Sequence, residues 1–218
     1  FDKLKPRRWR NFANIRTQKN CMSTSPKIIG ISGTNGSGKD SLGLALQDQY
    51  GYMFISVTDL LRDELRRRNL PIIRANMRMV SAQWRREFGG GVLIEKAVSS
   101  WHQFRPNATG VVIASLRNPL EADSVHEHEG VVLWLDADPK TRYERVQANR
   151  DSRGSRKGED DVTFEQFLEA EKAEMFSSGD EATLNMSAVK DVSDYVIIND
   201  KPDVESLTEY VAQQLGLE

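Results

Sequence analysis

The sequence has a single cysteine, Cys21, among its 218 residues. A framework of disulfides within the chain is therefore excluded, and a reducing, cytoplasmic setting is expected. The sequence also lacks any uninterrupted apolar run long enough to cross a bilayer, and its mean hydropathy is −0.55, so we expect a soluble protein without a membrane partner. An apolar fraction of 39% is enough to fill the core of one domain.

Acidic residues are nearly absent from the first 21 positions, which hold seven basic residues against the single acid Asp2. The other 23 basic and 31 acidic residues make the body of the chain acidic, and an acidic body is not expected to bind nucleic acid. Because Met22 stands just before the first predicted strand, residues 1–21 are expected to be a disordered basic tail, either an upstream extension or a remnant of expression. Targeting to an organelle, or binding to an anionic surface, stays open as a role for such a segment.

Short β-branched runs alternate with longer amphipathic segments along the rest of the chain. This alternation is typical of a parallel sheet wrapped by helices. Strands are predicted over residues 27–32, 52–56, 110–114, 131–135 and 195–199. Helices are predicted over residues 38–49, 59–68, 74–88, 93–104, 119–126, 139–149, 163–174 and 204–215. We therefore expect residues 22–218 to form a single α/β domain, with a five-stranded parallel sheet in a three-layer α/β/α arrangement.

A charged, glycine-containing stretch at residues 150–161 separates two of these helices. It is too polar to belong to a core, so the sequence predicts a mobile loop, and such loops over phosphate sites often act as lids. The four residues from Thr163 to Gln166 have the spacing of a capping box, which indicates that a helix begins just after this loop.

The segment GTNGSGK, between the first predicted strand and the first predicted helix, has the pattern of a phosphate-binding P-loop. Glycine allows a tight turn with backbone amides directed at phosphate oxygens, and the N-terminus of the helix adds partial positive charge. The lysine is expected to follow the β- and γ-phosphates during transfer. The nucleotide-binding candidates are Gly33, Thr34, Asn35, Gly36, Ser37, Gly38, Lys39, Asp40 and Ser41. The sequence thus predicts a site for a nucleoside triphosphate, with ATP as the expected ligand.

One position departs from the usual P-loop pattern. Asp40 follows the lysine where Ser or Thr commonly binds Mg²⁺, and the hydroxyl comes one residue later, at Ser41. The same offset is found in adenylate-kinase-like phosphotransferases, and the chain resembles the nucleoside monophosphate kinase branch of the P-loop kinases in further segments.

The segment ISVTDLLR, residues 55–62, looks like the one that shapes the acceptor nucleotide site in adenylate kinases. The resemblance implies that Ser56 and Asp59 border the acceptor and that Arg62 holds its phosphate. Arginine suits this role because its planar fork pairs two phosphate oxygens and stays charged.

The segment LRNP, residues 116–119, is similar to an arginine-bearing element of these kinases and implies that Arg117 is a second phosphate clamp. The acid that the family carries at the end of the preceding strand is replaced here by Ala114 and Ser115. Either Asp40 or Asp59 would therefore assist Ser41 in holding Mg²⁺, or the handling of the metal is weakened.

Three further segments extend the resemblance. LDADP at 135–139 and the arginines that follow look like the beginning of the lid, which implies that Arg145 and Arg150 cover ATP. Residues 73–89 resemble acceptor-site helices of archaeal-type adenylate-kinase-like proteins and make Arg74 and Arg85 candidates for the substrate side. SDYVIIN, at residues 193–199, resembles a strand of dephospho-coenzyme A kinases whose following loop passes close to the adenine, which implies a cofactor contact at Asn199.

The resemblance implies an ATP- and Mg²⁺-dependent phosphotransferase that acts on a nucleoside or deoxynucleoside monophosphate, as a monomer or dimer. Helices within residues 57–104 would bind this small phosphate-bearing acceptor, and Lys39, Arg62, Arg117 and Arg150 would act in catalysis. A dephospho-coenzyme A kinase stays open as an alternative, with Asp59 as general base for a sugar hydroxyl. So does an ATP-binding assembly or regulatory factor with vestigial transfer, because of the acid missing at Ala114.

Overall fold

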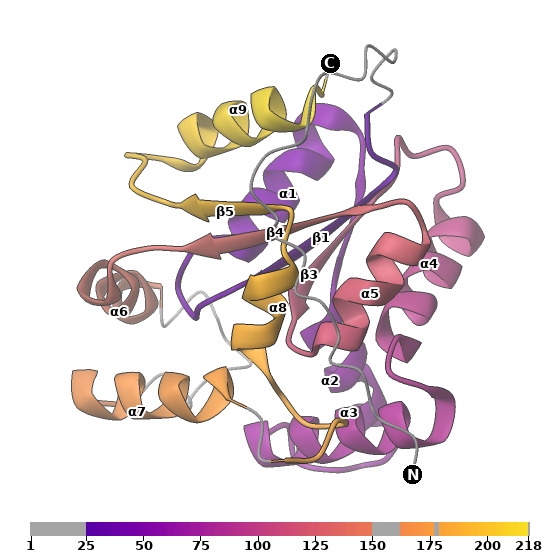
Figure 1. The fold of residues 1–218 in the computed structure, drawn as a ribbon, viewed down its shortest axis with the longest axis vertical. Coiled ribbons are helices and arrows are strands. Elements are labelled where there is room, and N and C mark those ends of the chain that lie inside the picture. The colour runs from indigo at the N-terminus through magenta and orange to yellow at the C-terminus, as the bar shows by residue number, and fades with distance from the viewer. Residues whose placement is uncertain (1–24, 150–161, 177–178, 218) are drawn as a thin grey trace, which may run out of the picture.

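Five parallel strands form one sheet in the computed structural model, which describes residues 25–149, 162–176 and 179–217. The strand order is β2-β3-β1-β4-β5 (Figure 1). The strands are β1 (Ile28–Gly33), β2 (Met53–Ser56), β3 (Val111–Leu116), β4 (Val131–Asp136) and β5 (Tyr195–Ile198). All five predicted strands are confirmed. The proposed tail at 1–21 and the proposed lid at 150–161 lie outside the described residues.

The helices occupy the segments between these strands. They are α1 (Lys39–Tyr50), α2 (Val57–Arg67), α3 (Arg74–Phe88), α4 (Val92–Phe104), α5 (Pro119–Glu127), α6 (Pro139–Ala148), α7 (Phe164–Met175), α8 (Met186–Val192) and α9 (Val204–Leu215). The predicted helices are confirmed to within two residues at each end. The capping box before α7 is also confirmed, since Thr163 and Gln166 exchange side-chain to backbone hydrogen bonds. None of the helices in the described ranges is long and apolar enough to span a membrane.

Helix α8 was not predicted from the sequence. It has only seven residues, of which Met186 and Val189 are buried, so it is too short to show a repeated apolar spacing. Its one local signal is Asn185, whose side chain accepts a hydrogen bond from the backbone N–H of Ala188 and so caps the helix.

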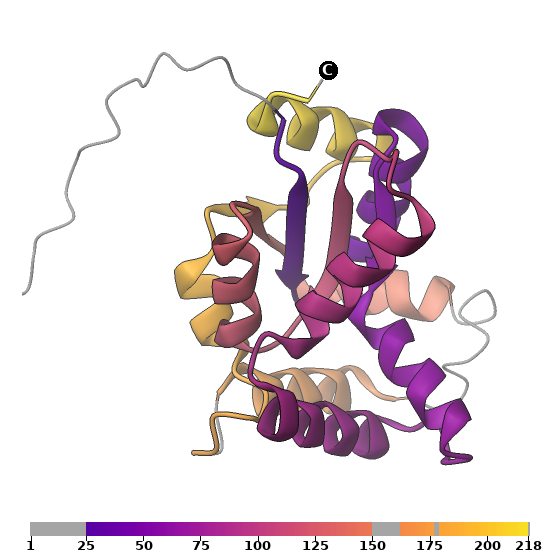
Figure 2. The same ribbon diagram turned by 90° about the vertical axis from the view of Figure 1, so that its right-hand side faces the viewer.

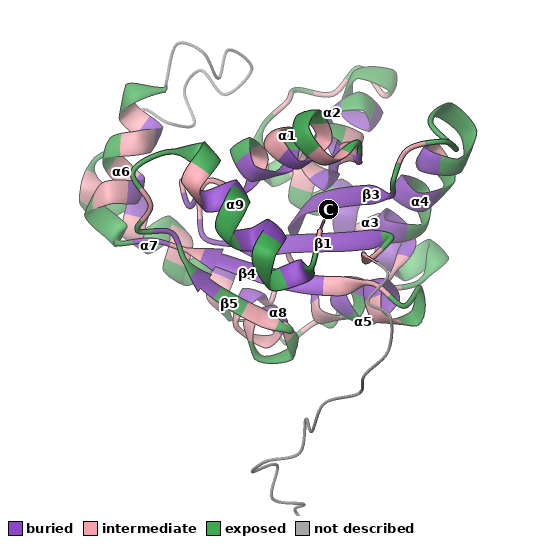
Figure 3. Ribbon diagram, turned by 90° about the horizontal axis from the view of Figure 1, so that it is seen from above, coloured by how far each residue is buried: buried purple, intermediate pink, exposed green. Residues whose placement is uncertain are grey.

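Alternate side chains of the strands enter two separate cores. Ile29 of β1 packs in one core with Leu46 of α1 and Val211 of α9, whereas Ile28 belongs to the other core, with Leu93 of α4. Seen from above, the buried strands run between α1 and α9 on one side and α5 and α8 on the other (Figure 3). The predicted three-layer α/β/α arrangement is therefore confirmed.

Helix α4 is part of the layer that covers the sheet. It buries Leu93, Ile94 and Trp101 in the same core as Ile113 of β3. Helices α2 and α3 also contribute to this core, through Leu65 and Trp84 among others, and the prediction that helices within residues 57–104 bind an acceptor stays a prediction.

The carboxyl end of β1 is the point around which the site is built. β1 lies between β3 and β4, and a parallel sheet whose strand order reverses in this way leaves a crevice at the carboxyl ends of its strands. Figure 2 shows β1 directed toward α3 and α7, which lie next to each other at the base of the molecule in Figure 1. Residues distant in the sequence therefore meet at this crevice.

Candidate functional site

The turn from β1 to α1 is shaped by close approach of other backbone segments. A Cβ atom at Gly33 would lie 1.8 Å from the carbonyl oxygen of Leu135, and one at Gly36 would lie 2.5 Å from that of Arg142, so any larger residue would displace the loop. Gly38 is the N-cap residue of α1 and offers no side chain to the amides of the first turn. The N-terminus of α1 therefore has the features of an anion-binding site.

Buried side chains hold this loop in place. The Thr34 hydroxyl donates to Asp136 Oδ1 at 2.7 Å, and the Ser37 hydroxyl donates to the Thr34 carbonyl at 2.9 Å. Asn199, which was expected to contact the nucleotide, donates from Nδ2 to the Ser37 carbonyl at 2.8 Å and is not among the residues that line the cavity described below. The loop is therefore held in place by three side chains that do not line the cavity, those of Thr34, Ser37 and Asn199.

Arg142 of α6 is a further support that the sequence interpretation missed. Its guanidinium is almost fully buried, donates to the Ala137 carbonyl at 2.8 Å and to the Asn35 carbonyl at 3.3 Å, and forms an ion pair with Glu171 of α7. An arginine so enclosed cannot cover a nucleotide, and it instead links the loop to α6 and α7.

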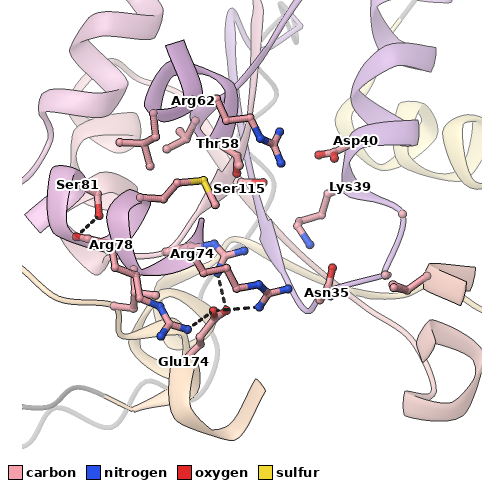
Figure 4. A pocket seen from close by; sticks show the side chains of 18 of the residues that line it. Asn35, Lys39, Asp40, Thr58, Arg62, Arg74, Arg78, Ser81, Ser115 and Glu174 are labelled. Atoms are coloured by element: carbon pink, nitrogen blue, oxygen red, sulfur yellow. Dashed lines mark hydrogen bonds and ion pairs between the residues drawn. The ribbon is translucent and has the colours of Figure 1, made fainter. Parts of the chain in front are cut away.

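A cavity of about 630 Å³ lies between this loop, α2, α3, the end of β3, α6 and α7 (Figure 4). Its volume is in the usual range for small-molecule sites. Seven cationic side chains from the described residues line it, against two carboxylates. The cations are Lys39, Arg62, Arg74, Arg78, Arg85, Arg117 and Arg145, and the carboxylates are Asp40 and Glu174. A cavity with this balance favours a ligand that carries several negative charges.

Lys39 stands on the loop side of the cavity. Its ammonium donates to the Thr34 carbonyl at 2.5 Å, and its side chain projects into the cavity beside Asn35 and Asp40 (Figure 4). Arg145 of α6 also lines this side, and its Nη1 is buried with no hydrogen-bond partner among the described residues. A buried donor without a partner is costly unless a ligand supplies the acceptor, so the loop and Arg145 fit the phosphates of a nucleotide. Arg150, the other predicted lid arginine, lies outside the described residues.

The predicted metal ligands divide into two groups. Asp40 and Ser41 line the cavity next to Lys39, whereas Asp59 does not line it; the Asp59 side chain is 62% exposed and accepts a hydrogen bond from Arg62 at 2.7 Å. Asp59 is therefore positioned to orient Arg62, and its role as a metal ligand stays a prediction. The described residues contain no cluster of three metal-ligating side chains, which is compatible with Mg²⁺ because this ion commonly binds one or two protein groups together with substrate phosphates.

Arg62 of α2 reaches the cavity from the side opposite the loop. The residue is 5% exposed, and its Nε has no hydrogen-bond partner among the described residues. The neighbouring Ser56 caps α2 without a side-chain hydrogen bond, and its buried hydroxyl likewise finds no partner in the described part of the chain. Ser56 does not line the cavity, whereas Val57, Thr58, Leu61 and Arg62 of this segment do, and Arg62 is the charged residue among these four.

Arg85 of α3 has a structural partner. Its guanidinium lies 2.6 Å from the fully buried carboxylate of Glu121 and donates to the Ala182 carbonyl at 2.9 Å. The other oxygen of Glu121 accepts from the backbone N–H of Arg117 at 2.7 Å. Arg85, expected on the substrate side, therefore fixes the turn between β3 and α5.

The same turn begins with a β-bulge. Ile31 pairs with Ala114 but Ser32 pairs with Leu116, so Ser115 is the extra residue, and its φ of 72° is uncommon for a residue with a side chain. The bulge lies at the cavity, which both Ser115 and Arg117 line. Strain of this kind is typical of functional sites.

Glu174, in the last turn of α7, is the main functional candidate that sequence reasoning missed. Its carboxylate lies 2.5 Å from Arg117, 2.7 Å from Arg78 and 3.5 Å from Arg74 (Figure 4). Burial alone would raise the pKa of this carboxyl, but the three arginines, Arg117 foremost, outweigh burial and hold the pKa below its ordinary value. No local sequence pattern indicates this cluster, because its members come from α3, the end of β3 and α7.

The sheet order, the glycine loop with its lysine, and the cationic cavity together define a P-loop nucleoside triphosphatase fold of the kinase-like type. The family model described as "AAA domain" (AAA_18) matches residues 29–167, more than half of the chain, and the chain belongs to this family.

Two sets of known proteins resemble the chain. A UPF0200 protein of Pyrococcus abyssi is 29% identical over 177 residues, which cover 79% of this chain and 87% of the relative. A UPF0200 protein of Methanocaldococcus jannaschii is 26% identical over 176 residues, covering 80% and 82%. Among solved structures, the shikimate kinase of Bacteroides thetaiotaomicron has a TM-score of 0.52 at 18% identity, covering 87% of this chain and 98% of that chain. The shikimate kinase of Acinetobacter baumannii, in complex with shikimate, has a TM-score of 0.50 at 17% identity, covering 88% and 93%. At these identities the solved structures are similar in fold.

Proposed function

We propose that this protein transfers the γ-phosphoryl group of ATP to the phosphate of a nucleoside or deoxynucleoside monophosphate. One observation carries the proposal: a single cavity has the P-loop lysine on one side and four arginines, in addition to the structural Arg85, on the other. These four are Arg62, Arg74, Arg78 and Arg117. A donor triphosphate and an acceptor phosphate can therefore bind face to face, each with its own cations.

Phosphoryl transfer needs little covalent chemistry from a protein, because positioning and charge neutralisation supply most of the rate. An oxygen of the acceptor phosphate attacks the γ-phosphorus, and the bond from that phosphorus to the β–γ bridging oxygen breaks, so that ADP leaves. In this scheme the P-loop amides and Lys39 hold the donor, and Arg62 and Arg117 orient the acceptor. Asp40 and Ser41 are the residues that would hold Mg²⁺, which when bound neutralises charge on the β- and γ-phosphates.

The surroundings of Asp59 favour a phosphate acceptor over dephospho-coenzyme A. A sugar hydroxyl benefits from a general base, whereas a phosphate oxygen is already charged and needs none. Asp59, the base that the hydroxyl reaction was expected to use, is exposed and paired with Arg62. The alternative of an ATP-binding assembly factor predicts binding of ATP without acceptor-dependent release of ADP.

The proposal is tested by a coupled assay of ADP release over a panel of nucleoside and deoxynucleoside monophosphates, with dephospho-coenzyme A included. We expect turnover that depends on at least one monophosphate. Turnover with dephospho-coenzyme A alone, or ATP binding with no acceptor-dependent ADP release, would overturn the proposal.

Replacing Arg62 with alanine is expected to raise the KM for the acceptor by about 100-fold and to change the KM for ATP by less than about threefold, because a bidentate arginine–phosphate pair is lost on one side of the cavity only. Steady-state kinetics with each substrate varied in turn would measure both. Arg66→Ala is the matched control, since Arg66 lies on the same helix and pairs with Asp63 through the same spacing but is exposed. Equal rises in both KM values would contradict the assignment of Arg62 to the acceptor.

A further inference from the structure

Glu174 occupies the place where three arginines converge. Its side chain is 8% exposed, and both carboxylate oxygens have partners: Oε1 faces Arg74 and Arg78, and Oε2 faces Arg117. Arg78 and Arg117 both donate hydrogen bonds to it. A phosphate bound by these arginines would have to share them with this carboxylate.

Local preferences do not explain a carboxylate at this position. Glu174 lies in the last turn of α7, where the helix dipole disfavours negative charge, and burial of a charge adds a desolvation cost. The arginines offset both effects, but a neutral residue would avoid them altogether. A residue that breaks local rules within a cavity indicates a functional constraint.

The charges on the acceptor side suggest what that constraint is. With Arg85 committed to Glu121, four other arginines of the described residues line the acceptor side, and three of them converge on the carboxylate of Glu174; the four are Arg62, Arg74, Arg78 and Arg117. A phosphate monoester carries at most two negative charges, since its second proton is lost with a pKa of about 6, whereas a diphosphate carries more. Without the carboxylate of Glu174, the same arginines would present one more positive charge, which suits a more highly charged group.

We infer that Glu174 determines the charge selectivity of the acceptor site: by neutralising one of the converging arginines, it matches the site to a phosphate monoester and against a diphosphate. This inference rests on the proposed function, since it concerns the acceptor of the same reaction. Glu174 acts through the arginines and is therefore a specificity-determining residue outside the reacting atoms.

Binding of simple anions to the intact protein tests the inference without any turnover. The donor site is first saturated with a non-hydrolysable ATP analogue, and inorganic phosphate and pyrophosphate are then titrated by calorimetry. Glu174→Gln keeps the shape of the side chain and removes its charge. We expect phosphate to bind on the order of tenfold more tightly to this variant than to the wild type, and pyrophosphate to gain more than phosphate, because one repelling charge has left the site.

Glu169→Gln is the matched control, since Glu169 lies on the same helix and is exposed. It is expected to leave the affinities for phosphate, pyrophosphate and the ATP analogue unchanged. Unchanged or weaker phosphate binding in Glu174→Gln would overturn the inference, because it would mean that Glu174 only holds the arginines in place.

A double variant keeps the inference testable if Glu174→Gln does not fold. Glu174→Gln combined with Arg78→Gln restores the net charge of the site. Both anions are expected to bind more weakly because a phosphate-binding arginine is lost, but the ratio of pyrophosphate to phosphate affinity is expected to return to within about threefold of the wild type. A ratio that stays shifted toward pyrophosphate would contradict control by charge. If no monophosphate is phosphorylated by the wild type, the proposed function fails, whereas the anion affinities still decide the role of Glu174.

Discussion

Replacing Lys39 with alanine is expected to abolish phosphoryl transfer, with a fall in kcat of at least about a thousandfold, while the protein remains folded. The loss follows from the position of the ammonium group, which enters the cavity beside the N-terminus of α1. Arg142, which also lies against the loop, cannot replace it, because this arginine is buried and held by Glu171 and the carbonyl of Ala137. Without Lys39, charge that develops on the transferring group would be left without its mobile cation.

The protein is expected to stay folded when Lys39 is replaced, because the hydrogen-bond acceptor of Lys39 keeps a second donor. Lys39 donates to the Thr34 carbonyl, but the Ser37 hydroxyl donates to the same carbonyl at 2.9 Å, so the acceptor stays satisfied. Removal of one cation from a strongly cationic cavity also relieves repulsion. Single-turnover kinetics and thermal unfolding would measure both effects, with Lys140→Ala, an exposed lysine on α6, as control. Transfer that survived in Lys39→Ala would mean that the donor does not bind at this loop.

Replacing Arg85 with methionine is expected to destabilise the protein by about 3–5 kcal/mol, since it leaves a buried carboxylate without its partner. Glu121 is 0% exposed, and its pairing with Arg85 is the only salt bridge found for it among the described residues. For a domain of this size, the melting temperature would fall by roughly 10 °C. Glu121 also accepts from the backbone of Arg117 and Asn118, so the turn that carries Arg117 would loosen with it.

Arg86 provides the comparison, since it is the next residue on α3 and forms an exposed ion pair with Asp180. Arg86→Ala is expected to cost less than about 1 kcal/mol, because exposed pairs contribute little. Combining Arg85→Met with Glu121→Gln would recover part of the lost stability by removing the uncompensated charge. Chemical denaturation of the four proteins would measure these differences. Similar losses in Arg85→Met and Arg86→Ala would show that the Arg85–Glu121 pair is not the stabilising contact that we describe.

The layered fold could be predicted because its signals are local. The β-branched runs that became β1, β3 and β4 alternate with capped amphipathic helices, and the glycine pattern before Lys39 lies wholly within one turn. Helix α8 escaped prediction because two buried residues, Met186 and Val189, cannot establish a period. Local sequence patterns were thus sufficient to predict the architecture and the residues on the loop side of the cavity.

The acceptor side could be predicted only in part, because a sequence does not distinguish an arginine that can bind a ligand from one that forms a structural ion pair. Arg62, Arg74 and Arg117 do line the cavity, but so does Arg85, whose charge is committed to Glu121. Only the fold separates these roles, since it brings Glu121 of α5 to α3. Glu174 was missed for the same reason: its partners lie 57 to 100 positions earlier in the chain, and its own surroundings in the sequence resemble an exposed helix end.

The most direct measurement of the central claim is to follow the γ-phosphoryl group itself. The protein would be incubated with ATP labelled at the γ-phosphate and with the monophosphate that supports ADP release, and the products would be separated. We predict that the label appears in a nucleoside diphosphate, in amounts equal to the ADP formed, and that Lys39→Ala abolishes its appearance. Label released only as inorganic phosphate would contradict the account, because it would mean that the cavity hydrolyses ATP and does not transfer its phosphoryl group to an acceptor.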